Sequence, residues 1–174
     1  LKKKCRIVIL SHLGRPKGIG FEPDFSLFPI FEKLQEYLPK SRVKYVNDVI
    51  GEKVDYCLII HQNGEVLLLE NLRFYKEEKS DDSDFAKKLA NYGEYYINDA
   101  FGVMHRRHSS VYNLPLLFPA YKKCCGYLVE KELLFLVDKL KEPNRPYTII
   151  IGGAKIADKI DLIKNIVEKA EHIL

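Results

Sequence analysis

Long apolar runs are absent from this chain of 174 residues. Apolar runs such as residues 7–10 and 149–151 are the size of strands and far shorter than the roughly 20 apolar residues that span a bilayer. A secretory signal is also absent, because the opening Leu-Lys-Lys-Lys leads into a strand pattern. With 47% hydrophobic and 30% charged residues, the composition is that of a globular domain. We therefore expect a soluble protein that does not act at a membrane.

Cysteine is sparse and lacks a recognisable pattern. The cysteines at positions 5, 57, 124 and 125 include no Cys-x-x-Cys pair, and adjacent ones such as Cys124 and Cys125 rarely bridge each other. Reduced thiols indicate a cytoplasmic protein. The formal net charge of +4, with acidic and basic residues alternating, implies nothing by itself about partners. The chain lacks a starting Met and stops inside a helical pattern at Leu174, so we expect that both ends are cut.

Near-continuous aliphatic runs predict buried parallel strands. They cover residues 6–11, 66–70, 94–98 and 147–151, with weaker candidates at 43–46 and 56–60. Helical spacing lies between them, over 27–38 (with Ser26 as a cap and Pro29 in the first turn), 84–92, 133–140 and 160–174. The alternation predicts an α/β fold, a three-layer Rossmann-like parallel sheet with helices on both faces. The charged stretch 141–146, which contains two prolines, is the best domain boundary that composition offers.

The loops that follow the strands are the candidate site, because open parallel sheets bind ligands at the carboxyl ends of their strands. The first loop, residues 11–18, reads Ser-His-Leu-Gly-Arg-Pro-Lys-Gly. Its glycines let backbone amides approach an anion, and Arg15 offers two parallel donors, although a basic surface turn has the same composition. Arg73 follows the strand at 66–70, where a structural ion pair with Glu70 or another acid is the simpler interpretation of this residue alone.

Four potentially cationic side chains stand in succession after the strand at 94–98, as His-Arg-Arg-His at 105–108. They repel each other unless an anion joins them. The histidines could suggest zinc, but no cysteine or carboxylate stands at ligand spacing, so we predict no resident metal. A basic loop that faces nucleic acid or solvent is the alternative.

The last predicted strand ends in Gly152 and Gly153, which open a helix. Free amides and the positive end of the helix dipole favour an anion there, and Lys155 and Lys159 lie four residues apart on one helix face. The spacing is neither that of a Walker loop nor that of a Gly-x-Gly-x-x-Gly turn. Since four cationic loops would otherwise repel each other, they predict a shared ligand that is small, phosphorylated and highly negative.

The same segments resemble the phosphoglycerate kinase family. The resemblance rests on residues 11–18, 69–74, 97–110 and 152–160, and covers essentially the whole chain in order. It implies a reversible glycolytic phosphoryl transfer between 1,3-bisphosphoglycerate and ADP, giving 3-phosphoglycerate and ATP, by a monomer that binds Mg²⁺ with the nucleotide. A site rich in Arg and Lys without a nucleophile suits this chemistry, because phosphoryl transfer depends on positioning and cationic stabilisation.

The resemblance also implies roles for individual residues and segments. Residues 1–126 would be a glycerate-binding N-terminal domain, 127–142 an interdomain helix, and 143–174 the start of a nucleotide-binding C-terminal domain. An upstream Asp-x-Asn motif and most of the nucleotide domain would lie outside the chain, so we expect the chain alone to be inactive. Substrate would bind to His12, Leu13, Gly14, Arg15, Arg73 and Arg106, nucleotide to Gly152, Gly153 and Lys159, with Lys155 and Arg106 catalytic and His105 and His108 extending the basic patch.

Three other interpretations compete with this one. A nucleic-acid-binding α/β module would spread its cations over an exposed face with interleaved aromatics, whereas here they cluster at strand ends, so we expect no nucleic-acid partner. A dinucleotide oxidoreductase would need the glycine fingerprint that is absent. A catalytically silent homologue stays open. Residues 112–115, Tyr-Asn-Leu-Pro, are larger than the family resemblance leads us to expect, which leaves the local loop shape open.

Overall fold

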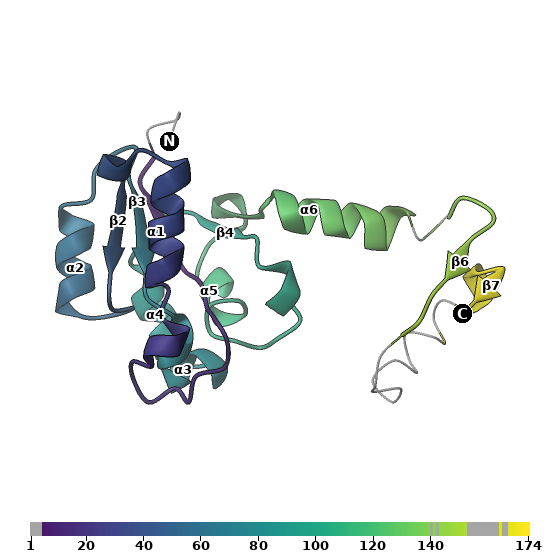
Figure 1. Ribbon diagram of the computed structural model, residues 1–174, viewed down its shortest axis with the longest axis horizontal. Coiled ribbons are helices and arrows are strands. Elements are labelled where there is room, and N and C mark those ends of the chain that lie inside the picture. The colour runs from purple at the N-terminus through teal and green to yellow at the C-terminus, as the bar shows by residue number, and fades with distance from the viewer. Residues whose placement is uncertain (1–4, 140, 142, 153–163, 165–166) are drawn as a thin grey trace. The chain divides into compact units, whose positions relative to one another are not determined.

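The computed structural model describes residues 5–139, 141, 143–152, 164 and 167–174 (Figure 1). The chain divides into two compact units, Leu1–Gly126 and Tyr127–Leu174. The division falls between Gly126 and Tyr127 and not in the charged stretch 141–146 that composition indicates.

A parallel sheet forms the centre of the first unit. Its strands are β1 (Ile7–Ile9), β2 (Val43–Val46) and β3 (Val66–Leu69), in the order β1-β3-β2. The central strand, β3, pairs in parallel with both neighbours and is buried at every position, which explains its uninterrupted aliphatic sequence. A second parallel pair joins β4 (Tyr96–Asn98) and β5 (Lys123–Cys125). The predicted parallel α/β architecture is confirmed.

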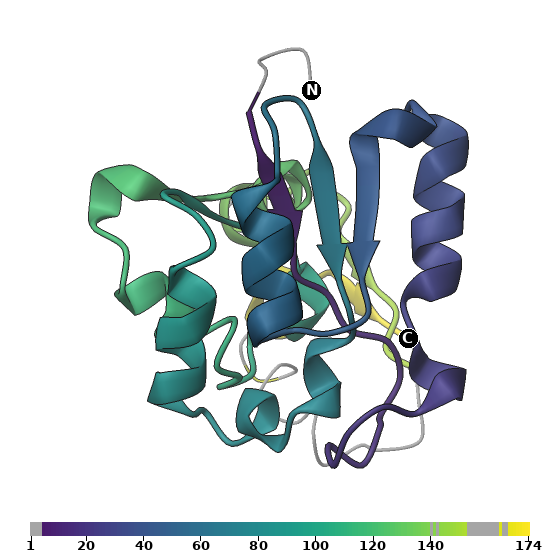
Figure 2. The same ribbon diagram turned by 90° about the vertical axis from the view of Figure 1, so that its left-hand side faces the viewer.

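Helices lie on both sides of the first sheet. The chain passes from β1 over β3 to β2 and then returns to β3, so two right-handed crossovers place α1 (Phe28–Tyr37) and α2 (Glu52–Ile59) on opposite faces. Figure 1 shows β2 and β3 between these helices, and Figure 2 looks onto the face that α2 covers. A third helix, α4 (Ser83–Ala90), packs against α5 (Asn113–Leu116). The remaining helical segments of this unit are short: Pro23–Phe25, Lys40–Arg42, Leu72–Phe74, α3 (Lys76–Lys79), Phe101–Val103 and Ala120–Lys122.

Two groups of buried apolar side chains hold these layers together. One lies between the sheet and α2 and consists of Val46, Val54, Leu67 and Leu69. The other joins the ends of β2 and β3 to α4 and α5 and consists of Val49, Leu72, Phe85, Ala86, Leu89, Leu114 and Phe118. The second group lies directly behind the loops that follow the strands, so it fixes the places from which those loops start.

The starts of the helices agree with the sequence pattern. Helix α1 begins at Phe28, with Pro29 in its first turn, and the hydroxyl of Ser26 accepts a hydrogen bond of 3.1 Å from the backbone N–H of Phe28. Helix α4 is capped by Asp82, whose Oδ1 accepts from the N–H of Phe85 at 2.7 Å.

One predicted strand is wrong. Residues 56–60 belong to the end of α2, not to a strand. Val54, Cys57 and Leu58 face the sheet at helical spacing, while Tyr56 and Ile59 are 64% and 80% exposed. A short run of apolar residues fits either structure, and here only one side of the run has an apolar surface to pack against.

The second unit contains one longer helical stretch and one strand pair. Helix α6 (Tyr127–Leu133) continues as a π-helix over Leu134–Lys139, so the predicted helix over 133–140 is present but begins earlier. Strand β6 (Thr148–Ile149) pairs in parallel with β7 (His172–Ile173). The predicted helix over 160–174 is therefore wrong at its end, where Val167–Lys169 is a 3₁₀ turn and a strand follows. Most of residues 160–166 lie outside the described residues.

Cys57, Cys124 and Cys125 form no disulfide bonds. None of the helices in the described part of the chain is long and apolar enough to cross a membrane.

Candidate functional site: a cationic cluster at the strand ends

The loops after β1 and β3 are joined by backbone and amide hydrogen bonds. The N–H of Leu72 donates to the carbonyl of Ser11 at 3.1 Å. The side-chain amide of Asn71 donates to the carbonyls of Leu13 and Phe25, each at 2.8 Å. Asn71 is fully buried, so these bonds are shielded from water. One side chain therefore holds both ends of the loop that contains Arg15.

Glu70 is not the ion-pair partner of Arg73 that the sequence suggested. It is 1% exposed, and both of its carboxylate oxygens already accept hydrogen bonds from other groups. The donors are the hydroxyls of Ser26 and Tyr45 and the backbone N–H groups of Leu27 and Asn71. Glu70 thus ties α1 to the end of β3, and the structural ion pair between Glu70 and Arg73 is wrong.

Arg73 is a buried cation with unused hydrogen-bonding capacity. It is 8% exposed, and its Nη1 donates to the carbonyl of Gly14 at 2.7 Å. Its Nε is buried and has no hydrogen-bond partner among the described residues. Burial and the nearby Arg106 lower the pKa of Arg73, Glu78 raises it, and Arg15 lowers it further. Since buried polar groups are nearly always hydrogen-bonded, the unpaired Nε marks a place for an acceptor that the described residues do not supply.

The other predicted substrate residues lie in the same neighbourhood. Burial, followed by the charges of Arg73, His108 and Arg106, lowers the pKa of His12 to about 4. Burial, Arg73 and Arg106 likewise lower the pKa of His108. Such effects weaken as the distance between two charges grows, so they indicate that these groups are neighbours. The structure therefore brings together His12, Arg15, Arg73, Arg106 and His108 from three loops.

The loop after β4 is fastened to α3 through two serines. The N–H and the hydroxyl of Ser109 donate to the carbonyls of Glu78 and Glu77, at 2.9 and 2.6 Å. The N–H of Ser110 donates to Oε2 of Glu78 at 3.0 Å, and its hydroxyl donates to Oε1 at 2.6 Å. These bonds bring Arg106 and His108 beside the loop that carries Arg73.

Not every cation of the basic loop joins this cluster. Arg107 forms an ion pair of 3.1 Å with Asp81 and lies 4.3 Å from the centre of the Tyr112 ring. Tyr112 is thus the stacking surface of an arginine, which gives a local reason for the large residue in a loop where smaller ones were expected. Arg106 and His105 are exposed.

Gly14 shapes the first loop. Its φ is +60°, a conformation that residues with a Cβ adopt at a cost, and an added Cβ would lie 2.3 Å from Cδ1 of Phe25. The turn between His12 and Arg15 therefore needs glycine for both backbone and space. Leu13 is 39% exposed, and its carbonyl is the group that Asn71 holds.

The predicted nucleotide residues are largely outside the described structure. Gly152 is exposed in the second unit, whereas Gly153, Lys155 and Lys159 lie outside the described residues. Within the described ranges no group of three His, Cys, Asp or Glu side chains could hold a metal ion.

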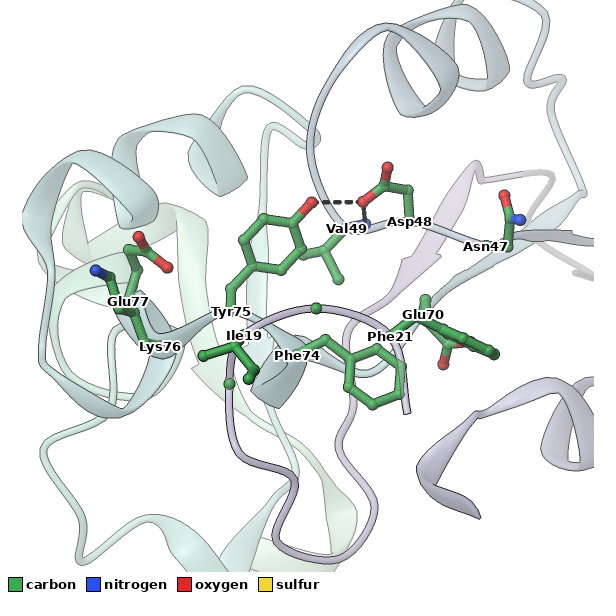
Figure 3. Close-up of a pocket in the computed structure, with 12 residues that line it drawn as sticks. Ile19, Phe21, Asn47, Asp48, Val49, Glu70, Phe74, Tyr75, Lys76 and Glu77 are labelled. Carbon is green, nitrogen blue, oxygen red and sulfur yellow. Dashed lines mark hydrogen bonds between the residues drawn. The ribbon is translucent and has the colours of Figure 1, made fainter. Parts of the chain in front are cut away.

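A pocket of about 470 Å³ also lies at this edge of the first unit (Figure 3). It is lined mainly by apolar and aromatic side chains, among them Ile19, Phe21 and Phe74, and the hydroxyl of Tyr75 donates to Asp48 at 2.6 Å on its wall. None of the clustered arginines and histidines lines it. It is therefore a feature separate from the cationic cluster.

Sequence reasoning missed the residues that hold the cluster in place. The sequence alone indicated no role for Asn71, Glu78 or Lys79. Glu78 is 2% exposed, and Nζ of Lys79 donates to the carbonyl of Pro16 at 3.0 Å. Only the position of Asn71 directly after a buried strand could have indicated a structural role.

The fold and the cluster together define a class: a parallel α/β protein with a cationic cluster on the loops that follow its strands, at the edge where such sheets bind ligands. The phosphoglycerate kinase family model matches residues 1–174 of the chain. The chain belongs to the phosphoglycerate kinase family.

Individual relatives agree with this assignment. A phosphoglycerate kinase of Chlamydia caviae is 45% identical over 177 residues, which cover 100% of this chain and 43% of the relative. That of Chlorobium phaeovibrioides is 46% identical over 97% of this chain and 42% of its own length. The solved phosphoglycerate kinase of Coxiella burnetii matches 99% of this chain with a TM-score of 0.82 and 32% identity, over 42% of that structure. The chain thus spans less than half the length of these relatives.

Proposed function

We propose that the protein to which this chain belongs is a working phosphoglycerate kinase. It transfers a phosphoryl group reversibly between the acyl phosphate of 1,3-bisphosphoglycerate and ADP, giving 3-phosphoglycerate and ATP, and is thus a phosphotransferase with a carboxyl group as acceptor. Family membership supports the reaction. The single observation that supports the substrate site is the environment of Arg73. Its guanidinium is buried and has an unpaired Nε, and other cations surround it. Among the described residues, no carboxylate is in ion-pair contact with it.

The first unit is proposed to bind the glycerate substrate. 3-Phosphoglycerate carries a phosphate and a carboxylate, and Arg15, Arg73 and Arg106 offer forked donors that match both groups. His12 joins them from the start of the same loop as Arg15, while Leu13 and Gly14 supply the backbone of the turn. Arg106, which is exposed, is proposed to act in catalysis as well, by stabilising the charge that spreads over the transferred phosphoryl group.

The second unit is proposed to begin the nucleotide site. Gly152 and Gly153, with Lys159, would bind nucleotide phosphates, and Lys155 would act on the phosphoryl group during transfer. Mg²⁺ would arrive with the nucleotide and neutralise phosphate charge. The cationic residues of the first unit do not fit a resident metal, because the described residues contain no cluster of three metal-binding side chains. A cytoplasmic monomer is the proposed context.

The test of this function measures ATP formation from 1,3-bisphosphoglycerate and ADP by a full-length protein that contains this chain. We expect magnesium-dependent turnover, and its absence in a folded protein would favour a catalytically silent homologue. The same assay on the present chain alone should show no appreciable turnover, because it spans 43% of the length of its Chlamydia relative. Calorimetry with 3-phosphoglycerate and with duplex DNA separates the substrate site from a nucleic-acid surface, since we expect binding of the former only.

A further inference from the structure

A carboxylate lies inside the cationic cluster. Glu78 belongs to α3 and is 2% exposed, and its charge raises the pKa of Arg73. Its Oε1 lies 3.8 Å from Nδ1 of His108. A buried negative charge beside a site for anions opposes their binding, so its presence there calls for a physical explanation.

The carboxylate of Glu78 is held rigidly. Ser110 donates to both of its oxygens, through the N–H to Oε2 and through the hydroxyl to Oε1. Burial raises the pKa of Glu78, while the bonds from Ser110 and the charge of Arg73 lower it. Because both oxygens are fixed, the negative charge cannot turn away when another anion arrives.

We infer that Glu78 is the internal counter-charge of the cationic site: it offsets the repulsion between Arg73 and the neighbouring cations in the empty site and weakens the hold of the filled site on its anion. The inference rests on the proposed function, since it concerns the affinity of the same site. A site that only gathered cations would be strained when empty and slow to release a highly charged product. Glu78 reduces both effects.

Several charged or titratable groups face Glu78 from different elements. Arg73 comes from the segment after β3, and His108 from the loop after β4. Tyr96 comes from β4, and burial together with other effects that include Glu78 raises the pKa of its hydroxyl to about 12. Of these groups, only Glu78 is a carboxylic acid, so its contribution can be separated by comparison with an uncharged isostere.

The test is the variant Glu78→Gln, titrated with inorganic phosphate and with 3-phosphoglycerate at pH 8. A glutamine keeps the shape and one acceptor, and the Ser110 hydroxyl can rotate to accept from the new amide. We expect binding that is about five- to twentyfold tighter than in the wild type, the effect of removing one charge several ångströms from the bound anion. Glu77→Gln, one residue earlier in the same helix, should change affinity less than about twofold. A merely structural role would instead weaken binding, and unchanged or weaker binding by Glu78→Gln overturns the inference.

Two further measurements test the inference without relying on a change in affinity. In the wild type, saturating phosphate should raise the pKa of Glu78, followed by carboxyl ¹³C NMR, because the coupling between two sites is reciprocal. Without any ligand, Glu78→Gln should lower the pKa of His108 relative to the wild type, because a nearby negative charge is lost. An unchanged His108 pKa contradicts the counter-charge even if neither anion binds, whereas failure of both anions to bind the wild type counts against the proposed function alone.

Discussion

The guanidinium of Arg73 donates a hydrogen bond of 2.7 Å to the backbone carbonyl of Gly14 and thereby joins the loop after β3 to the loop after β1. Gly14, whose carbonyl accepts this bond, has a left-handed backbone conformation, with φ at +60°. The arginine that shapes the turn is thus also the one whose Nε is left without a partner among the described residues. Arg73 thus contributes both to the shape and to the charge of the site.

Replacement of Arg73 by alanine should therefore weaken binding of 3-phosphoglycerate. We expect a loss of about 1.5–3 kcal/mol, the usual contribution of a hydrogen bond to a charged group. Arg42→Ala is the matched control, because Arg42 also donates to a backbone carbonyl, that of Asn63, at 3.2 Å, but stands before β2. Calorimetry on both variants decides the matter: equal affinities for Arg73→Ala and Arg42→Ala, with binding by the wild type established, would return Arg73 to a structural role.

How much of this the sequence could predict depends on how local each signal is. The run at 66–70 was correctly predicted as a buried strand, and every residue of β3 is apolar and buried. The run at 56–60 was ambiguous, because its helical face becomes visible only when Val54 and Leu58 are seen against the sheet. The sequence pattern of a segment does not show which surface that segment packs against in the fold.

In the candidate site, too, local features could be predicted from the sequence and long-range contacts could not. The glycines and the arginine of residues 11–18 could be recognised because the chemistry of a loop depends on residues that are adjacent in the sequence. Glu78 was not, because nothing in Lys-Glu-Glu-Lys distinguishes a buried carboxylate from a solvated one. Its role depends on Ser110, 32 positions away, and contacts at that distance are set by the fold.

Asn71 should prove to be a main support of the site. Its replacement by alanine leaves the carbonyls of Leu13 and Phe25, and the N–H of Arg73, without their side-chain partner. Since an unsatisfied buried group costs about 1–3 kcal/mol, and some of these groups can reach water after relaxation, we expect a loss of about 2–4 kcal/mol in the free energy of unfolding. Urea unfolding measures it.

Asn91→Ala is the control for this prediction. Asn91 is exposed at the end of α4, and its replacement should change stability by less than about 0.5 kcal/mol. A difference between the two variants of under 1 kcal/mol would mean that the loop is held mainly by its backbone bonds.

Lys155 should act in the transition state of the full-length enzyme. It follows Gly152 and Gly153 at the expected opening of a helix, where amides, dipole and ammonium group would converge on the charge that spreads during transfer. Lys155→Ala should lower kcat by about 10²–10³ and leave the KM values nearly unchanged. Lys159→Ala should instead raise the KM for the nucleotide. Steady-state kinetics with both substrates varied would refute the assignment by showing the whole effect of Lys155→Ala in KM.

His12 should make the folded chain sensitive to mild acid. Burial and the charges of Arg73, His108 and Arg106 lower its pKa to about 4, whereas an unfolded histidine titrates near 6.5. Between these values the unfolded chain binds a proton that the folded chain does not. The free energy of unfolding should therefore fall as the pH drops from about 6.5 toward 4, and the contribution of His12 is fully present only above this window.

The raised pKa of Glu78 acts in the opposite direction, but it is common to the wild type and to His12→Gln and cancels in their difference. Urea unfolding at pH 7, 6 and 5 should show a smaller loss of stability for His12→Gln than for the wild type. Parallel pH profiles for the two proteins would show that His12 does not carry a depressed pKa in the folded chain.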